Sequence, residues 1–299
     1  MTVDVRMCSS AAEERRSLEI YNEVWPHRAV SAENVDAWRR AARASVEFLG
    51  AVDDVDAGSA AVALETSRPG VAIMLVTVLP QLRRRGVGSA LFEAASSWAV
   101  AESARELETF VDADDEESQG FAVRRDFREH SREVGLELTL DGVEPADDDP
   151  PAGVEIVSLD DRPDLAHGAY DVGREALPDV PGGEEWTPPP FEQFAATHLR
   201  GVILLAVADG EVVGYAKLVP RPDGRSADHG MTAVKRDRRG RGIATSLKRA
   251  QIAWAKAQGF ERLTASNEER NAAMRRINAS LGYRSAPGRV RLRATLGAG

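Results

Sequence analysis

Two short segments rich in arginine and glycine have the residue types and spacing of a phosphate-binding turn. The first is Arg83-Arg84-Arg85-Gly86-Val87-Gly88 and the second is Arg239-Gly240-Arg241-Gly242-Ile243-Ala244. Each lies between an apolar run and a longer amphipathic run, as a turn between a strand and a helix does. The first amides of a helix have no partner within it, and small residues let a phosphate approach them closely. Both segments therefore predict anion sites that a pyrophosphate would fit.

The two turns belong to an internal repeat. Aligning Arg83 with Arg239, an offset of 156 residues, superimposes residues 78–101 on 234–257 with nine identities in 24 positions. Trp98 and Trp254 occupy the same helical position, which indicates a shared role in core packing. The repeat predicts that the chain consists of two copies of one fold.

The second copy has the clearer secondary-structure pattern. Two apolar runs around Asp209-Gly210 predict a β-hairpin, and Gly259 and Gly282 are typical of helix ends. The predicted strands are 154–159, 202–208, 211–219, one ending at 234, 262–265 and 290–294, and the predicted helices are 163–176, 191–198, 244–258 and 269–281. In the first copy the pattern predicts helix 88–101 and strand 107–111. This order indicates an α+β, mixed α/β fold.

Length and composition fit two ordinary globular domains. Residues 142–153 form an acidic, proline-containing stretch that we interpret as a linker between domains 1–141 and 154–299. A net charge of −10 argues against nucleic-acid binding. The single cysteine, Cys8, excludes an intrachain disulfide and a cysteine-rich metal site. The sequence shows no secretory leader and no apolar run approaching 18 residues, so we expect a cytoplasmic protein that does not bind membranes.

The pattern Arg-x-x-Gly-x-Gly/Ala between a strand and a helix resembles the acetyl-CoA signature of the GNAT N-acetyltransferase family. The resemblance covers both halves of the chain and implies two tandem GNAT domains. Each would be a mostly antiparallel, partly splayed mixed sheet flanked by helices. The resemblance also implies acetyl-CoA as the acyl donor and no metal.

The family resemblance implies cofactor-binding residues in both copies. In this family the strand before the signature splays from its neighbour, and its free amides bind the acetyl-pantetheine and polarise the thioester. An asparagine near the last helix commonly contacts the CoA arm. The residues implied in this way are Met231, Thr232, Ala233, Val234, Arg239, Gly240, Arg241, Gly242, Ile243, Ala244 and Asn271 in the second copy, and Val78, Arg83, Arg85, Gly86 and Gly88 in the first.

Four residues of the second copy are candidates for acid–base catalysis by the same resemblance. Asp228 and His229 lie upstream of the signature, where several family members carry a general base. The position of the usual general-acid tyrosine holds Asn278, whose carboxamide could still bond the sulfur or the acceptor. Protonation of the CoA thiolate is then left to Tyr283 or to an ordered water, or it proceeds without a dedicated acid.

The first copy lacks the corresponding polar groups. At an offset of 156 residues, Ala72 replaces Asp228, Ala122 replaces Asn278, and Asp126-Phe127 replaces the Gly-Tyr pair. We therefore expect the second domain to be catalytic and the first to be degenerate, with a structural or cofactor-binding role at most.

The sequence thus predicts an acetyl-CoA-dependent N-acetyltransferase in which an amine attacks the thioester directly. Glu184, Glu185 and Trp186 lie in a loop that shapes the acceptor pocket in this fold, where they suit a cationic amine, although a solvated loop explains them equally well. The expected acceptor is a small-molecule amine in preference to a protein. A mycothiol synthase, which is also a tandem GNAT protein, and a non-catalytic acyl-CoA-binding or sensing protein remain alternatives. The sequence leaves the oligomeric state open.

Overall fold

The computed structural model describes residues 2–143, 149–180 and 185–297, and these residues form two compact units. Unit 1 comprises Met1–Ser131 with Val290–Gly299, and unit 2 comprises Arg132–Arg289. Each unit therefore takes one strand from the other half of the sequence, which the predicted boundaries at 142–153 did not anticipate. The central linker residues, 144–148, lie outside the described part of the chain.

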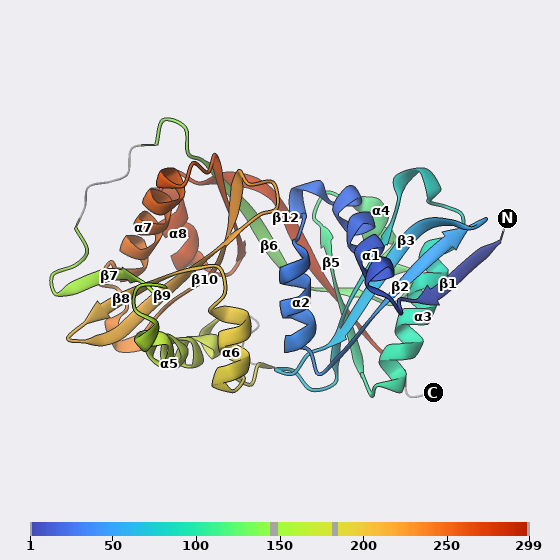
Figure 1. Cartoon of the computed structure of the whole chain (residues 1–299), viewed down its shortest axis with the longest axis horizontal. Helices are drawn as coiled ribbons and strands as arrows, with labels where there is room; N and C mark the ends of the chain where they lie inside the picture. Colours follow the sequence, from blue (N-terminus) through green and yellow to red (C-terminus); the bar gives the residue numbers. More distant parts are fainter. Residues whose placement is uncertain (1, 144–148, 181–184, 298–299) are drawn as a thin grey trace. The chain divides into compact units, whose positions relative to one another are not determined.

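Unit 1 is a mixed sheet with helices on both faces (Figure 1). The strands in spatial order are β1 (Val3–Met7), β2 (Ala44–Val52), β3 (Val55–Leu64), β4 (Val71–Val78), β5 (Glu106–Asp112) and the end of β12 (Arg284–Thr295), and the helices are α1 (Ala11–Val24), α2 (Ala32–Ala41), α3 (Val87–Ala101) and α4 (Glu116–Val123). Neighbouring strands run antiparallel from β1 to β4, and β4 and β5 run parallel. Leu49 packs with helix α1 on one face, whereas its neighbours Phe48 and Gly50 face helix α3 on the other.

Unit 2 repeats this architecture. The strands in spatial order are β6 (Arg128–Thr139), β11 (Arg262–Glu268), β10 (Ser226–Val234), β9 (Glu211–Pro220), β8 (Val202–Ala208) and β7 (Val154–Ser158), and the helices are α5 (Ala166–Ala176), α6 (Phe191–His198), α7 (Ile243–Ala257) and α8 (Ala272–Ser280). Strands β10 and β11 run parallel, and the other neighbours in this order run antiparallel. In Figure 1, helices α7 and α8 lie on one side of the strands, and α5 and α6 lie on the other. The predicted mixed fold is confirmed.

Alternating apolar residues give the sheet of unit 2 two buried faces, because successive side chains of a strand point to opposite sides. In β8, Ile203 and Leu205 pack with α5 and α6, whereas Leu204 and Ala206 pack with α7. A fully buried strand of this kind needs helices on both sides of the sheet.

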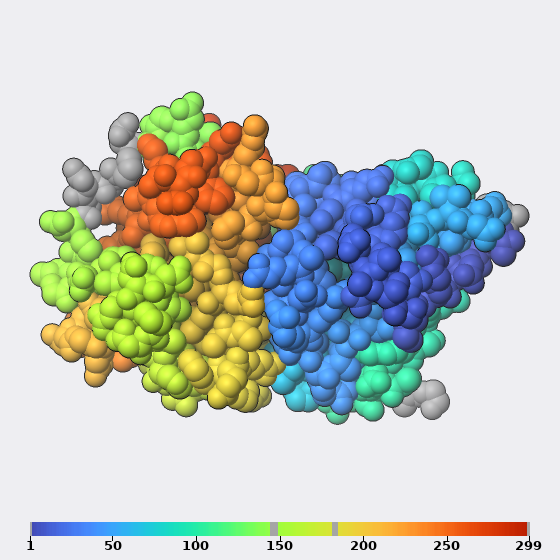
Figure 2. Space-filling view, in the orientation of Figure 1, coloured from blue at the N-terminus to red at the C-terminus, as the bar shows by residue number. Residues whose placement is uncertain are grey.

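Helices α1 and α2 of unit 1 are buried on one side only. The residues of α1 and α2 that face away from the strands form part of the molecular surface, coloured dark and medium blue in Figure 2. Only Ser17 and Ile20 of α1 and Ala37 of α2 are buried. No helix in the described ranges is long and apolar enough to span a membrane.

In both units, the parallel strand pair is paired over only three residues. Strand β4 pairs with β5 from Val71 to Ile73, and β10 pairs with β11 from Ser226 to Asp228. Beyond these residues neither pair has further ladder partners. The family resemblance implied this splay, and it leaves one edge of each long strand without a neighbour.

The end of β12 is an integral part of unit 1. Val290, Leu292 and Ala294 are buried in its main hydrophobic cluster. Glu108, which is fully buried, accepts hydrogen bonds from Arg293 of β12 at 2.6 Å and from Arg68 at 2.6 Å. Because two guanidinium groups neutralise this carboxylate, the pKa of Glu108 is lowered despite its burial.

Strands β6 and β12 approach each other closely within unit 2, where only glycine fits. A Cβ atom on Gly288 would lie 2.0 Å from the Glu133 carbonyl oxygen, and one on Gly135 would lie 2.0 Å from the Pro287 carbonyl oxygen. The atoms that such a Cβ would meet belong to the backbone, so the clash cannot be relieved by the movement of a flexible side chain.

We predict that Gly288→Ala lowers the free energy of unfolding by about 3 kcal/mol, because the new methyl group must push two strands apart. Urea denaturation followed by circular dichroism measures the change. Gly297→Ala is the control, since nothing lies within 4 Å of the position that its Cβ would take. Equal stability of Gly288→Ala and the parent chain would contradict the close approach.

Candidate functional site

The predicted phosphate-binding turn of unit 2 leads directly into α7. Gly242 caps the helix with a left-handed backbone (φ +85°), and no side chain bonds the first helical amides. Gly86 caps α3 in the same way (φ +88°). The turn conformation is shared further, since Gly240 (φ +73°) corresponds to Arg84 (φ +61°). Both helices therefore present unpaired amides and the positive end of the helix dipole to a ligand.

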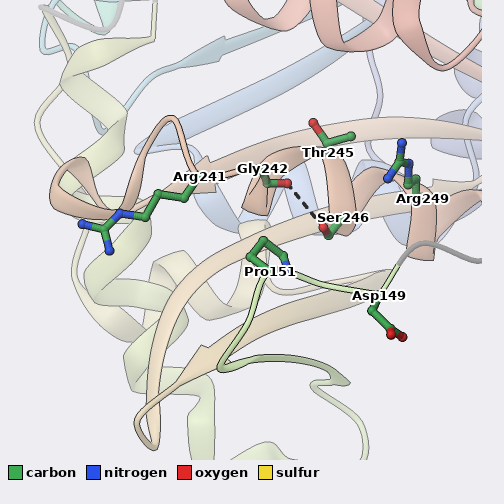
Figure 3. A pocket seen from close by; sticks show the side chains of 7 residues that line it. All are labelled: Asp149, Pro151, Arg241, Gly242, Thr245, Ser246 and Arg249. Atoms are coloured by element: carbon green, nitrogen blue, oxygen red, sulfur yellow. Dashed lines mark hydrogen bonds between the residues drawn. The ribbon is translucent and has the colours of Figure 1, made fainter.

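A pocket of about 520 Å³ opens at the start of α7 (Figure 3). Within it, the Ser246 hydroxyl donates to the Gly242 carbonyl oxygen at 3.3 Å. The Arg241 side chain points away from the other lining residues in Figure 3, and its Nη2 donates to the Asp237 carbonyl oxygen. The lining residues are Asp149, Pro151, Arg241, Gly242, Thr245, Ser246 and Arg249.

The signature arginines hold the turn in place. Arg239 donates from Nε to the Val234 carbonyl oxygen at 3.0 Å and pairs with Asp179 at 2.8 Å. Arg83 makes the same Nε bond to Val78 at 3.2 Å in unit 1. Because the contact recurs in both copies, its role is to fasten the turn to the preceding strand. The pKa of Asp179 is lowered to about 2 by Arg236 and Arg239.

The other residues predicted to bind the cofactor fall into two groups. Ala233, Val234 and Ile243 are buried in the core and can contribute only backbone groups. Met231 packs with the α5–α6 cluster, and its sulfur accepts a hydrogen bond from Tyr215. Asn271 caps α8 by accepting from the Met274 amide at 3.1 Å, so its side-chain oxygen serves the helix.

Strand β10 carries a β-bulge between His229 and Thr232, just beyond its last pair with β11. A bulge adds a residue and turns the following side chains, so it changes which face each one meets. Beyond the bulge, Ala233 packs with the α5–α6 side and Val234 with α7.

Two of the predicted catalytic residues beside the bulge, Asp228 and His229, contact different partners. Asp228 is held by Arg221, whose Nε donates to Oδ2 at 2.8 Å, and by the Thr264 hydroxyl. Its side chain is 42% exposed. His229 is instead half-buried and hydrogen-bonded through Nε2 to the Tyr283 hydroxyl. The structure therefore brings His229 and Tyr283 together and places Asp228 in a separate ion pair.

Two residues of α7 that the sequence did not single out, Lys248 and Gln251, form a polar cluster with His229 and Tyr283, and all but His229 are buried. The Lys248 ammonium lies 5.7 Å from the centre of the Tyr283 ring. Burial and the charge of Lys248 lower the pKa of His229 well below its usual range, and burial raises the pKa of Tyr283. Lys248 is 2% exposed and Gln251 is fully buried.

Several polar atoms around this cluster are buried without a hydrogen-bond partner. They are His229 Nδ1, Thr232 Oγ1, Asn278 Oδ1, and Nε2 and Oε1 of Gln251. The amide nitrogen of Asn278, at the usual tyrosine position, donates to Asn267 Oδ1 at 2.6 Å. Unmet polar groups in a core are costly, so these atoms are candidates for hydrogen bonds to a polar ligand or to bound water.

Unit 1 shows that the fold does not require these groups. Sheet register aligns His229 with Met74, since they pair with Leu218 and Val62, which are 156 residues apart. The bulge therefore shifts the alignment by one residue, and Ile73, not Ala72 as predicted, corresponds to Asp228. At the positions of His229, Thr232, Lys248, Gln251, Asn267, Asn278 and Tyr283, unit 1 has Met74, Val76, Phe92, Ala95, Val111, Ala122 and Phe127, all within one hydrophobic cluster.

Unit 1 also fills the space between its helices α3 and α4. The Arg125 guanidinium lies 3.5 Å from the centre of the Phe121 ring and donates to the Ser89 hydroxyl at 2.8 Å. Phe121 contacts the predicted cofactor residue Gly88, where a Cβ would lie 3.4 Å from the ring. Phe92 packs edge-on against Phe121.

Comparison with known protein families gives one match in each half of the internal repeat. The profile of the acetyltransferase (GNAT) family matches residues 12–127 and 169–283. No curated protein matches the chain.

Solved structures share the fold over the whole chain at low sequence identity. A tandem GNAT protein from the clavulanic acid biosynthesis pathway has 20% identity and a TM-score of 0.78, with 100% of both chains covered. A GCN5-related N-acetyltransferase from Sphaerobacter thermophilus has 20% identity and a TM-score of 0.72, with 98% of this chain and 95% of that chain covered. The chain therefore belongs to the acetyltransferase (GNAT) family, a family of acyltransferases, and carries one family domain in each half of its sequence.

Proposed function

We propose that the protein is an acetyl-CoA-dependent N-acetyltransferase whose working site lies in unit 2. The observation that carries this proposal is the combination, in one unit, of a helix start without a side-chain cap and a bulged strand that leaves its parallel neighbour after Asp228. The first feature suits the phosphates of CoA, and the second leaves strand amides for an extended arm and its carbonyl group.

The residues of unit 2 fit acetyl-CoA as the donor. Amides at the start of α7 and the hydroxyls of Thr245 and Ser246 would hold its phosphates beside the pocket of about 520 Å³. The partnerless polar atoms of Thr232 and Asn278 lie near the bulged strand and α8, where polar groups of the arm would satisfy them. When bound, acetyl-CoA supplies an acyl group activated as a thioester.

Asp228 is the residue that we assign to the incoming amine. It ends the paired part of β10 and is accessible, and Arg221 and Thr264 fix its orientation. A carboxylate has lone pairs for a further donor, so it can bind the amine and take its proton. Nitrogen then adds to the acetyl carbon while strand amides stabilise the carbonyl oxygen. We propose a small-molecule amine as the acceptor. Arg221 and the sheet flank the carboxylate of Asp228, and a small amine needs less space beside them than a protein segment does.

Unit 1 has a structural role in this proposal. Aromatic residues and Arg125 occupy the space between its helices, and its strand β4 pairs without a bulge.

We predict that Gly242→Trp abolishes acetyl-CoA binding, because a side chain there obstructs the helix start and strains a left-handed residue. Gly86→Trp is the matched control, since Gly86 caps α3 with nearly the same φ. Calorimetric titration should give one site per chain for the parent and for Gly86→Trp. Unchanged affinity in Gly242→Trp would show that acetyl-CoA does not bind at the start of α7. Loss of binding in Gly86→Trp alone would place the site in unit 1.

We predict that Asp228→Asn lowers kcat by about 100-fold at pH 7, because general base catalysis typically contributes a factor of that order. The Kd for acetyl-CoA should stay within about twofold. The assay measures release of the CoA thiol with a panel of small amines and peptides, and Asp237→Asn, an exposed acid on the signature loop, serves as control. A parent-like rate in Asp228→Asn would exclude Asp228 as the base. Binding without turnover by the parent chain would identify a sensor.

A further inference from the structure

Lys248 is an unusual residue for the middle of a protein core. It lies in the second turn of α7, is 2% exposed, and forms no ion pair with a carboxylate among the described residues. Transfer of an unpaired amine from water into a protein interior is costly. Unit 1 places Phe92 at this position, in the same fold, so packing does not require a lysine.

The neighbours of Lys248 define what its charge can act on. Tyr283, which follows α8, presents its ring to the ammonium at 5.7 Å. His229 of β10 is close enough for the two positive charges to repel, and Gln251 stands one turn further along α7 beside His229. The Lys248 ammonium therefore lies over the ring of Tyr283, whose hydroxyl is bonded to His229.

This arrangement answers a chemical need of the proposed reaction. Cleavage of the thioester leaves an electron pair on sulfur, and the family position for a proton donor holds Asn278, which cannot supply one. A buried tyrosine is a weak acid, because burial disfavours its phenolate. An ammonium group beside the ring offsets that penalty by stabilising negative charge on the phenol oxygen.

We propose that Lys248 is a positioning residue that enables Tyr283 to protonate the departing thiolate. This inference rests on the proposed function. The bond from the amine nitrogen to the acetyl carbon forms and the carbon–sulfur bond breaks, with its electron pair passing to sulfur. Sulfur takes the Tyr283 hydroxyl proton, Lys248 returns a proton to the phenolate, and the proton released by the amine restores Lys248 through solvent.

The acidity of Lys248 suits this exchange. Burial lowers the pKa of its amine to about 7, so the group gains and loses a proton near neutral pH. His229 is hydrogen-bonded to the Tyr283 hydroxyl, and its lowered pKa keeps the imidazole neutral near pH 7.

The test compares Lys248→Met with Lys256→Met, a control on the same helix whose lysine bonds the Val143 carbonyl oxygen. In Lys248→Met we expect kcat to fall by about 100-fold, the range of a lost proton donor, with a Kd for acetyl-CoA within about twofold of the parent. The thiol pKa of bound CoA, read from thiolate ultraviolet absorbance, should rise, since loss of a nearby positive charge disfavours the thiolate. Tyr283→Phe, which reproduces Phe127 of unit 1, should also lower kcat.

The free energy of unfolding distinguishes this role from a purely structural one. If Lys248 served only packing, its replacement would lower the stability of the protein, whereas the proposed role predicts no such loss. The folded pKa lies below that of an unfolded lysine, near 10.4, so the parent should gain stability as pH rises from about 7 to 10. The unfolding equilibrium constant should fall by up to about tenfold per pH unit. Lys248→Met should lack this contribution and be at least as stable at pH 7.

The outcomes separate the inference from the function on which it rests. Absence of acetyl-CoA binding by the parent chain would remove both. A parent that binds and turns over, together with Lys248→Met that has the parent kcat and the parent thiol pKa, would overturn the role of Lys248 and leave the acetyltransferase function standing. A loss of stability in Lys248→Met at pH 7 would assign the lysine to packing.

Discussion

The three-residue parallel pairing of β10 with β11 is the constraint on which the site depends. In a fully paired strand, the backbone amides would be hydrogen-bonded to the neighbouring strand, and the side chains would form an ordinary core. Because pairing stops at Asp228 and a bulge follows, the strand exposes backbone groups and redirects its side chains. The turn that fixes the start of α7 lies at the end of the same strand, so the proposed anion site and the divergence of the strands belong to one continuous segment.

The tandem repeat provides an internal reference for what this fold needs. Unit 1 retains the glycine cap, the left-handed turn and the arginine that fastens it, and therefore these features are properties of the backbone. The polar cluster is confined to unit 2, while unit 1 fills the same positions with apolar side chains. A difference in core chemistry on a shared backbone is stronger evidence for a specialised site than either domain alone.

Much of this organisation could be predicted from the sequence. The repeat and the glycine turns follow from local patterns and from the family resemblance. His229 and Tyr283 are separate candidates in the sequence, and only the fold shows that they are hydrogen-bonded to each other. Lys248 and Gln251 could not be found in this way, since both are common on the solvent side of an amphipathic helix and only the fold shows them to be buried. The bulge in β10 defeats a gapless alignment, which explains the shift from Ala72 to Ile73. Strand exchange is likewise invisible, because β6 and β12 have the same pattern in either location.

The exchanged strands also set an order for folding during protein synthesis. The core of unit 1 includes Val290, Leu292 and Ala294, and its buried Glu108 is neutralised in part by Arg293. On a ribosome, the first 131 residues emerge long before these partners do, so unit 1 must wait with an open sheet edge and an incompletely paired buried acid. Unit 2 receives β6 before its own strands appear. The domain encoded second can therefore complete its sheet first, and the nascent chain needs protection of the edge next to β5 until translation has passed residue 295.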